Sequence, residues 1–140
     1  MIKKIIAAID THDWSIEVIK EAMRQAQQEQ ATLSLVHVLE VPAVLYGDWP
    51  SNFSVEEYEG LTKSSLEELI DKAGAKKDQL RILQGHRVHS FCDYANSESA
   101  DLIVVGTHTK KGFEKLLGST ANGIINHAKC NVLAVRGDLS

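Results

Sequence analysis

Short apolar runs alternate with amphipathic segments from one end of the sequence to the other, and this alternation constrains the fold more than any other feature. The apolar runs predict strands at Ile2–Asp10, Leu33–Leu39, Gln79–Leu83, Leu102–Val105 and Asn131–Arg136. Apolar residues at helical spacing predict helices over Asp13–Gln30, Ser54–Ala73, His86–Ser99 and Ser119–Ala128. Strands that alternate with helices through short connections imply right-handed crossovers. The sequence therefore predicts an α/β fold, with a doubly wound, parallel open sheet and helices on both faces.

The length and composition fit one compact domain over residues 1–140. Of the 140 residues, 44% are hydrophobic and 24% are charged, so the chain can bury a core without disulfides. Cys92 and Cys130 are therefore expected to be reduced thiols that pack as small hydrophobic side chains. A net charge of -4 disfavours nucleic acid as a partner.

The apolar runs are too short for a membrane segment. The N-terminal run ends at Asp10, below the length of a signal-peptide core, and no stretch approaches about 18 consecutive apolar residues. We therefore expect a cytoplasmic protein with no membrane partner.

The segment Asp101–Thr120 combines a strand, a polar loop and a helix start in the order typical of a phosphate cradle. Gly106 ends the apolar run Leu102–Val105, and Gly118 followed by Ser119 opens the next helix. A helix N-terminus presents free backbone N–H groups and a positive dipole potential to an anion. This segment predicts nucleotide or phosphate binding, and Ser119 also suits a plain helix cap.

Three strand ends converge on one edge of the predicted sheet. Ligands of doubly wound sheets bind outside the carboxyl ends of the strands, near the point where strand order reverses. Asp10, Val38 and Gly106 all occupy such ends. Asp10 suits a ribose contact there, and its alternative role is to cap the following helix or to close a turn.

The residues at these strand ends, together with the C-terminal part of the chain, resemble the universal stress protein family. The resemblance rests on Ile9-Asp10, LVHVLE at Leu35–Glu40, GTHTKKGFEKLLGST at Gly106–Thr120 and GIINHAKCNVLAVRG at Gly123–Gly137. It implies a Rossmann-type sheet of five parallel strands in the order 3-2-1-4-5, of the adenine nucleotide alpha hydrolase type, with ATP or AMP bound at its carboxyl edge. It also implies a homodimer through the last strand, Val132–Val135, and a role in stress survival through protein partners that the sequence does not name.

Nucleotide-binding members of that family carry the motif Gly-x2-Gly-x9-Gly-Ser/Thr, and this chain departs from it. Gly106 and Gly118-Ser119 match the first and last elements. Thr109 replaces the second glycine, and only eight residues, Lys110–Leu117, separate it from Gly118. The departure is typical either of a branch that has lost the nucleotide or of a branch that retains it with a shortened loop.

The resemblance also implies which residues surround ATP or AMP, with or without Mg²⁺. The stretch Ala8, Ile9 and Asp10 borders the adenine and ribose, and Val38 meets the adenine edge through its main chain. The phosphates lie among the residues of the glycine loop and of the following helix start, namely Gly106, Thr107, His108, Thr109, Gly118, Ser119 and Thr120.

Other chemistries find less support in the sequence. The loop is no Walker A motif, because five residues separate its glycines and Phe113 follows the second. His86, His89 and Cys92 are spaced by three along a predicted helix, but no fourth metal ligand accompanies them. His37 lies among apolar residues and is expected to be a satisfied core or sheet-end side chain. No residue is assigned a catalytic role, so any hydrolysis of ATP is expected to be slow.

These observations support two hypotheses about function. In the first, bound ATP or AMP orders the segments Thr107–Leu117 and Glu40–Phe53 and thereby changes the surface that partners meet. In the second, the chain is a nucleotide-free dimer that binds partners. A slow ATPase is a third hypothesis.

Overall fold

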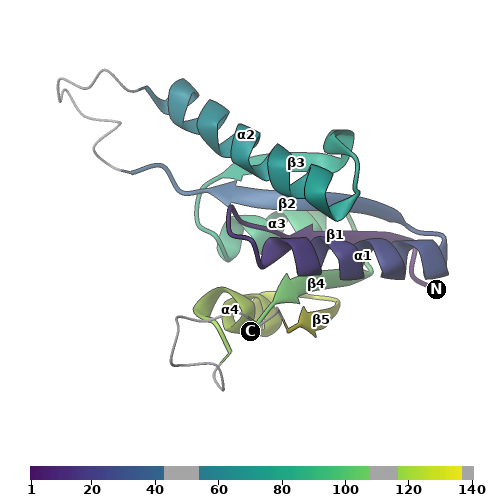
Figure 1. Cartoon of the computed structure of the whole chain (residues 1–140). Helices are drawn as coiled ribbons and strands as arrows, with labels where there is room; N and C mark the ends of the chain where they lie inside the picture. Colours follow the sequence, from purple (N-terminus) through teal and green to yellow (C-terminus); the bar gives the residue numbers. More distant parts are fainter. Residues whose placement is uncertain (43–53, 108–116, 137–140) are drawn as a thin grey trace.

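The computed structural model describes residues 1–42, 54–107 and 117–136, in which strands and helices alternate (Figure 1). The strands are β1 (Lys4–Ala8), β2 (Thr32–Leu39), β3 (Leu80–Gln84), β4 (Leu102–Gly106) and β5 (Asn131–Val135). The helices are α1 (Ser15–Glu29), α2 (Val55–Ala73), α3 (His89–Ser97) and α4 (Ser119–His127), and the short 3-10 helix η2 (Lys77–Gln79) leads into β3. The alternation predicted from the sequence is confirmed.

The strands form one parallel sheet in the order β3-β2-β1-β4-β5. β1 lies at its centre, where Ile5 pairs with Leu33 of β2 on one side and with Leu102 of β4 on the other. The chain builds β2 and β3 on one side of β1 and then returns to build β4 and β5 on the other. The predicted parallel sheet and its order 3-2-1-4-5 are confirmed, and strand order reverses between β1 and β4.

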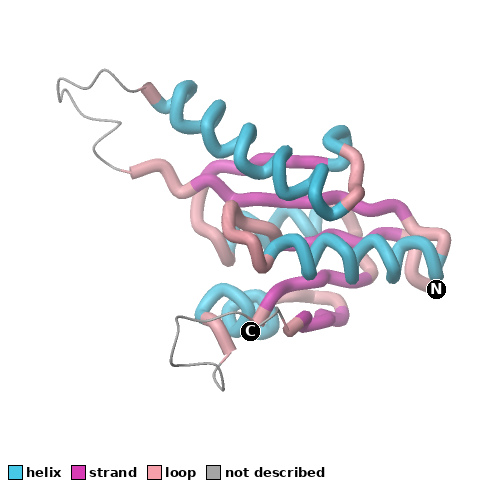
Figure 2. The backbone as a smooth tube through the Cα atoms, viewed as in Figure 1, coloured by secondary structure: helices cyan, strands magenta, loops and turns pink. Residues whose placement is uncertain are grey.

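Helices cover both faces of the sheet (Figure 2). Successive side chains of a strand point to opposite faces, so Ile5 and Ala7 pack with α1 and α2, whereas Ile6 packs with α3 and α4. Fully buried helix side chains include Ile19, Leu66 and Ile70 on the first face and Phe91 and Ile124 on the second. Because both faces are covered, the central strands are continuous apolar runs. None of the described helices combines the length and the apolar composition that a membrane span requires.

The ends of α2 lie where the sequence predicts them. Ser54 precedes the helix, and its Oγ accepts a hydrogen bond from the N–H of Glu57 (3.1 Å). Gly74 follows the helix at φ +83°, a left-handed conformation that glycine adopts without a Cβ clash. These two residues set the length of the helix that carries Tyr58 and Thr62.

α3 begins later than the sequence indicates. The predicted helix starts at His86, whereas α3 starts at His89. The Nδ1 atom of His86 accepts hydrogen bonds from the N–H groups of Val88 (3.2 Å) and His89 (3.3 Å), so its ring occupies free donors at the helix start. Gly85, at φ +141°, turns the chain out of β3 ahead of this cap. The segment Gly85–Val88 is therefore a structured turn at the carboxyl edge of the sheet.

The carboxyl edge of the sheet is stepped. β1 ends at Ala8, which pairs with Val36, whereas β2 continues through Leu39. On the other side of β1, β4 ends at Gly106. The end of β1 is thus recessed between β2 and β4, at the point where strand order reverses and where ligands of such sheets bind.

Asp101 joins the starts of the two central strands at the opposite edge of the sheet. Its Oδ2 accepts hydrogen bonds from the backbone N–H groups of Lys3 (2.8 Å) and Lys4 (2.9 Å), and its own N–H donates to the Lys4 carbonyl (2.8 Å). These backbone donors hold the pKa of the Asp101 carboxyl below its ordinary value. The start of β1 is thereby fastened to a residue 97 positions further along the chain.

Candidate functional site

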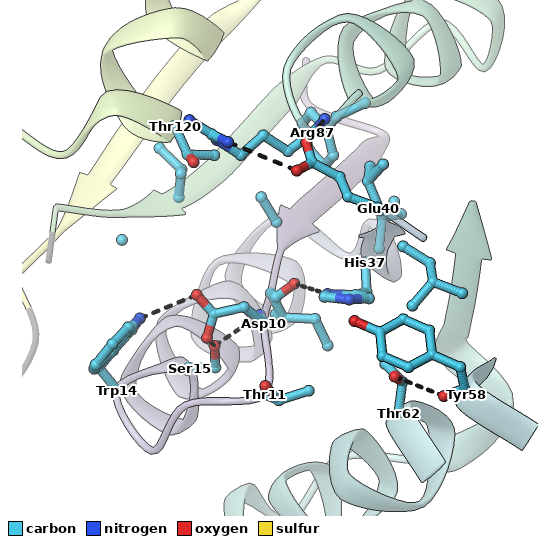
Figure 3. Close-up of a pocket in the computed structure, with 18 residues that line it drawn as sticks. Asp10, Thr11, Trp14, Ser15, His37, Glu40, Tyr58, Thr62, Arg87 and Thr120 are labelled. Carbon is cyan, nitrogen blue, oxygen red and sulfur yellow. Dashed lines mark hydrogen bonds and ion pairs between the residues drawn. The ribbon is translucent and has the colours of Figure 1, made fainter. Parts of the chain in front are cut away.

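A cavity of about 430 Å³ lies at the recessed end of β1 (Figure 3). This volume is within the range of about 300 to 1,000 Å³ that is usual for small-molecule pockets. The lining comes from the ends of β1, β2 and β4, from all of the helices α1 to α4, and from the turn that follows β3. The lining residues are Ala8, Ile9, Asp10, Thr11, Trp14, Ser15, Val36, His37, Val38, Leu39, Glu40, Tyr58, Thr62, Arg87, Phe91, Val105, Gly106 and Thr120.

The cavity brings together residues that the sequence predicted separately, from three strand ends and one helix start. From the predicted set, it is lined by Ala8, Ile9, Asp10, Val38, Gly106 and Thr120. Thr107 directly follows the lining residue Gly106 in the sequence, and its N–H donates to the Val135 carbonyl (2.9 Å). Gly118 and Ser119 directly precede the lining residue Thr120. His108 and Thr109 lie outside the described residues, so their roles stay predictions.

Asp10 is held by hydrogen bonds at the rim of the cavity. Its Oδ1 accepts from the N–H of His12 (2.9 Å) and the hydroxyl of Ser15 (3.0 Å), and its Oδ2 accepts from the indole Nε1 of Trp14 (3.3 Å). Asp10 therefore organises the turn before α1, as in the alternative to a ribose contact. The residue that precedes α1 is Trp14, and it makes no side-chain cap. A carboxylate accepts about four hydrogen bonds, so Oδ2 has room for another donor.

The main chain of Val38 faces the recessed end of β1. The carbonyl of Val36 accepts a hydrogen bond from the N–H of Ile9 (2.9 Å), so Val36 bonds toward β1. Consecutive residues of a parallel strand bond alternately to the strands on either side, so the N–H and carbonyl of Val38 point the same way as those of Val36. Because the β1 ladder ends at Ala8, these groups of Val38 face the cavity that Val38 lines.

His37 is a hydrogen-bonded side chain at the end of the sheet, as the sequence predicts. Its Nδ1 lies 2.8 Å from the carbonyl oxygen of Ile9. A carbonyl only accepts, so Nδ1 carries the proton in this contact. His37 and Tyr58 of α2 both line the cavity, and Figure 3 shows their rings together.

One wall of the cavity is apolar. β2 contributes Val36, and β4 contributes Val105. Phe91 of α3 completes this wall and is only 1% exposed. Apolar side chains beside a few main-chain donors and acceptors are typical of small-molecule pockets.

Arg87 lies at another side of the cavity, between the end of β2 and the start of α4 (Figure 3). Its backbone N–H donates to Oε1 of Glu40 (2.8 Å), and its Nη1 lies 3.7 Å from Oε2 of Glu40. Its Nη2 donates to Oγ of Ser119 (3.2 Å). The side chains of Arg87 and Glu40 are 47% and 45% exposed. This side of the cavity therefore carries the guanidinium group of Arg87 together with the carboxylate of Glu40.

α4 begins beside the cavity. Gly118 precedes the helix with φ −61° and ψ 155° and makes no side-chain cap. Ser119 is the first helical residue, so it is not the N-cap that the sequence allowed. Thr120 lies in the first turn and lines the cavity. The N–H groups of a first turn have no partner within the helix and favour an anion.

Several lining residues are absent from the sequence-based prediction. Glu40 follows β2 and Arg87 follows β3, so the rule that ligands bind at carboxyl ends of strands could have found both. Tyr58 and Thr62 lie within α2, and their approach to the cavity depends on how that helix packs. No local sequence signal marks residues of this second kind.

The histidines and cysteine near α3 do not form a metal site in the described residues. The rings of His86 and His89 lie 4.7 Å apart, but Cys92 is buried in the core. Burial raises the pKa of the Cys92 thiol, and the charge of Asp93 adds to this effect, so the thiol stays protonated. Cys92 and Cys130 are both free thiols. Within residues 1–42, 54–107 and 117–136, no group of three or more His, Cys, Asp or Glu side chains is arranged to hold a metal ion.

Known proteins share both the sequence pattern and the fold of this chain. Residues 1–136 match the model of the universal stress protein family. The chain is 41% identical over 137 residues to universal stress protein A homolog 1 of Coxiella burnetii, with 95% of each chain covered. In fold it is similar to a universal stress protein in complex with cAMP (TM-score 0.69, 22% identity, 98% of each chain) and to the universal stress protein UspA from Lactobacillus plantarum (TM-score 0.72, 24% identity, 96% of this chain and 97% of the other). The chain belongs to the universal stress protein family.

Proposed function

We propose that the chain binds an adenine nucleotide, AMP or ATP, at the carboxyl edge of its sheet and acts as a nucleotide-responsive stress-survival factor. One observation carries this proposal: a single cavity unites Ala8–Asp10, Val38, Gly106 and Thr120, which the family resemblance assigns to the nucleotide. The similar fold that is complexed with cAMP supports the class of ligand. The free thiols Cys92 and Cys130 suit the reducing cytoplasm, where we place the protein.

The adenine base fits beside Val38. The main-chain N–H of Val38 suits N1 of adenine, which accepts a hydrogen bond. The carbonyl of Val38 suits the N6 amino group, which donates one. The wall that includes Val36 and Phe91 offers apolar contact to the face of the ring. Recognition by these main-chain groups would favour adenine over bases with a different donor and acceptor pattern.

The ribose and phosphates fit the other parts of the cavity. Asp10 has room to accept a hydrogen bond from a ribose hydroxyl. Thr120 and the N–H groups at the start of α4 offer hydrogen bonds and a favourable dipole to a phosphate. With ATP, any Mg²⁺ would be held mainly by the phosphates and by water, and Asp10 and Glu40 are the carboxylates that line the cavity.

Nucleotide binding predicts a rise in thermal stability. Protein purified through a denatured state, refolded and shown to have its native circular dichroism spectrum is unfolded with and without millimolar AMP or ATP. A ligand present at about 100 times its dissociation constant adds about 2.7 kcal/mol to the free energy of unfolding. We expect this to raise the Tm by about 5 °C or more for a chain of this length.

Two glycine variants sharpen this test. Gly118→Leu places a large side chain directly before α4 and is expected to abolish the shift in Tm. Gly60→Leu is the matched control on α2, where an added Cβ meets nothing within 4 Å, and it should keep the shift. Native protein without any shift would favour the nucleotide-free, partner-binding dimer, whereas a shift with turnover of ATP would favour a slow ATPase.

We further propose that the protein is a homodimer through β5, an edge strand of the sheet. The carbonyl of Val135 accepts from Thr107, so Val135 bonds toward β4, and Ala134, one residue earlier, turns its main chain to the outer edge. Native proteins cover such edges. Ala134→Pro removes an N–H from the outer edge and keeps the bonds to β4, so it should convert a dimer into a monomer. Light scattering measures the molar mass, and a monomeric wild type at micromolar concentration would contradict the proposal.

A further inference from the structure

We propose that Arg87 recognises the phosphate of the nucleotide by exchanging its partner Glu40 for that phosphate. This inference rests on the proposed function, and it adds a specificity-determining side chain that the glycine motif does not contain. The pair of Arg87 and Glu40 would let the cavity distinguish a nucleotide from a nucleoside.

The guanidinium of Arg87 lies beside the start of α4. Nη2 of Arg87 donates to the hydroxyl of Ser119, which is the first residue of α4. Arg87 lines the same cavity as Thr120, and Figure 3 shows the two residues side by side. A phosphate that binds at the start of α4 therefore lies within reach of the guanidinium.

The guanidinium is held only loosely by Glu40. The distance of 3.7 Å between Nη1 and Oε2 is too long for a hydrogen bond. The two side chains are about half exposed, and an ion pair in such a setting contributes little net free energy. A phosphate accepts two parallel, charge-assisted hydrogen bonds from a guanidinium, which are about twice as strong as neutral ones. Exchange of Glu40 for a phosphate is therefore favourable.

Only the side chain of Arg87 has to move. Its backbone N–H is held by Oε1 of Glu40 (2.8 Å), and the N–H of the preceding residue, His86, donates to Oγ of Ser90 (3.1 Å). A second cavity of about 440 Å³ is also lined by Glu40 and Arg87, so the two cavities adjoin at this pair. The guanidinium can leave Glu40 without displacing atoms of the core.

Glu40 makes the exchange selective for charge. A neutral ligand such as adenosine cannot replace the carboxylate as a partner of Arg87. AMP can, because its phosphate is an anion that the guanidinium binds through two hydrogen bonds. A phosphate that failed to engage Arg87 would lie close to the negative charge of Glu40 and would be repelled.

Calorimetric titration of the refolded protein with AMP and with adenosine tests the inference. For Arg87→Ala we expect AMP to bind about tenfold more weakly, equivalent to about 1.4 kcal/mol, because a charge-assisted contact is lost. Binding of adenosine should change by less than about twofold, since adenosine carries no phosphate. Arg81→Ala is the charge-matched control: Arg81 is exposed on β3 and does not line the cavity, so neither ligand should be affected.

A second variant tests the role of Glu40. Glu40→Gln keeps an oxygen that can accept from the N–H of Arg87 but removes the competing charge. AMP should bind about threefold more tightly to this variant, and adenosine should bind as it does to the wild type. Thermal unfolding without ligand shows that each variant is folded, which separates a lost contact from a lost structure.

Each contrary result has a distinct meaning. Equal AMP affinities for Arg87→Ala and Arg81→Ala would overturn the inference and leave the proposed function intact. Equal losses for AMP and adenosine would also overturn it, because they would show that Arg87 acts only through the structure of the turn. If wild-type protein binds neither ligand, the proposed function and the inference fail together.

Discussion

Replacing Phe91 with alanine is expected to lower the free energy of unfolding by about 3 to 5 kcal/mol. Phe91 is 1% exposed and packs with Ile6, Val36 and Ile124 in the core between the sheet and helices α3 and α4. Truncation removes a buried ring and leaves a cavity beside the sheet. The strands cannot move into this cavity without breaking the hydrogen bonds between neighbouring strands. The expected loss is a large fraction of the roughly 5 to 15 kcal/mol that stabilises a typical domain.

Urea denaturation of wild type and Phe91→Ala measures this loss as a lower midpoint with an unchanged slope. Leu61→Ala is the control, because Leu61 is 61% exposed on α2. This control should change the free energy of unfolding by no more than about 0.5 kcal/mol. A loss below about 1 kcal/mol for Phe91→Ala would contradict the packing described for this face of the sheet.

Replacing Gly85 with alanine is expected to cost about 2 to 5 kcal/mol, from backbone strain together with overpacking. Gly85 has φ +141°, a conformation that residues with a Cβ rarely adopt. A Cβ added there would clash with Oγ of Ser90 and lie 3.3 Å from its Cβ. If Ser90 rotates away, it no longer accepts the hydrogen bond from the N–H of His86 (3.1 Å). The turn that presents Arg87 to the cavity is therefore expected to loosen as well.

Gly60→Ala is the control for this substitution, with an expected effect of opposite sign. Gly60 lies within α2, and an added Cβ meets nothing within 4 Å. Alanine is a better helix former than glycine by about 0.8 to 1 kcal/mol, so this variant should be more stable than the wild type. Thermal unfolding of the two variants side by side gives the comparison, and similar Tm values for both would refute the strain assigned to Gly85.

Much of the sheet could be predicted because its signals are local. Leu102–Val105 is a continuous apolar run since helices cover both faces of β4, and Gly106 completes the strand. The strand order, in contrast, came from the family resemblance, because periodicity does not say which strands are neighbours. The predicted start of α3 is wrong because the ring of His86 caps the helix from outside. This contact depends on a side-chain conformation.

The site was predictable where it consists of strand ends and of the start of α4. Asp10 and Val38 could be placed because the apolar pattern shows where their strands stop. Glu40 and Arg87 form a pair because β2 and β3 are neighbours in the sheet, which brings together residues 47 positions apart. Tyr58 reaches the cavity through the packing of α2. The pairing of Glu40 with Arg87 and the approach of Tyr58 to the cavity both arise from tertiary structure, and no local pattern encodes them.

The hydrogen bonds between Asp101 and the start of β1 form only after the chain has been made as far as β4. β1 has only β2 beside it until β4 has been synthesised, because its second partner begins at Leu102. The cavity also needs Thr120 from α4. Closing a loop has an entropic cost that grows with its length, and pairing between distant segments slows folding in general. A nascent chain that ends before α4 cannot form the whole cavity, so a ligand of this cavity cannot guide the early stages of folding on the ribosome.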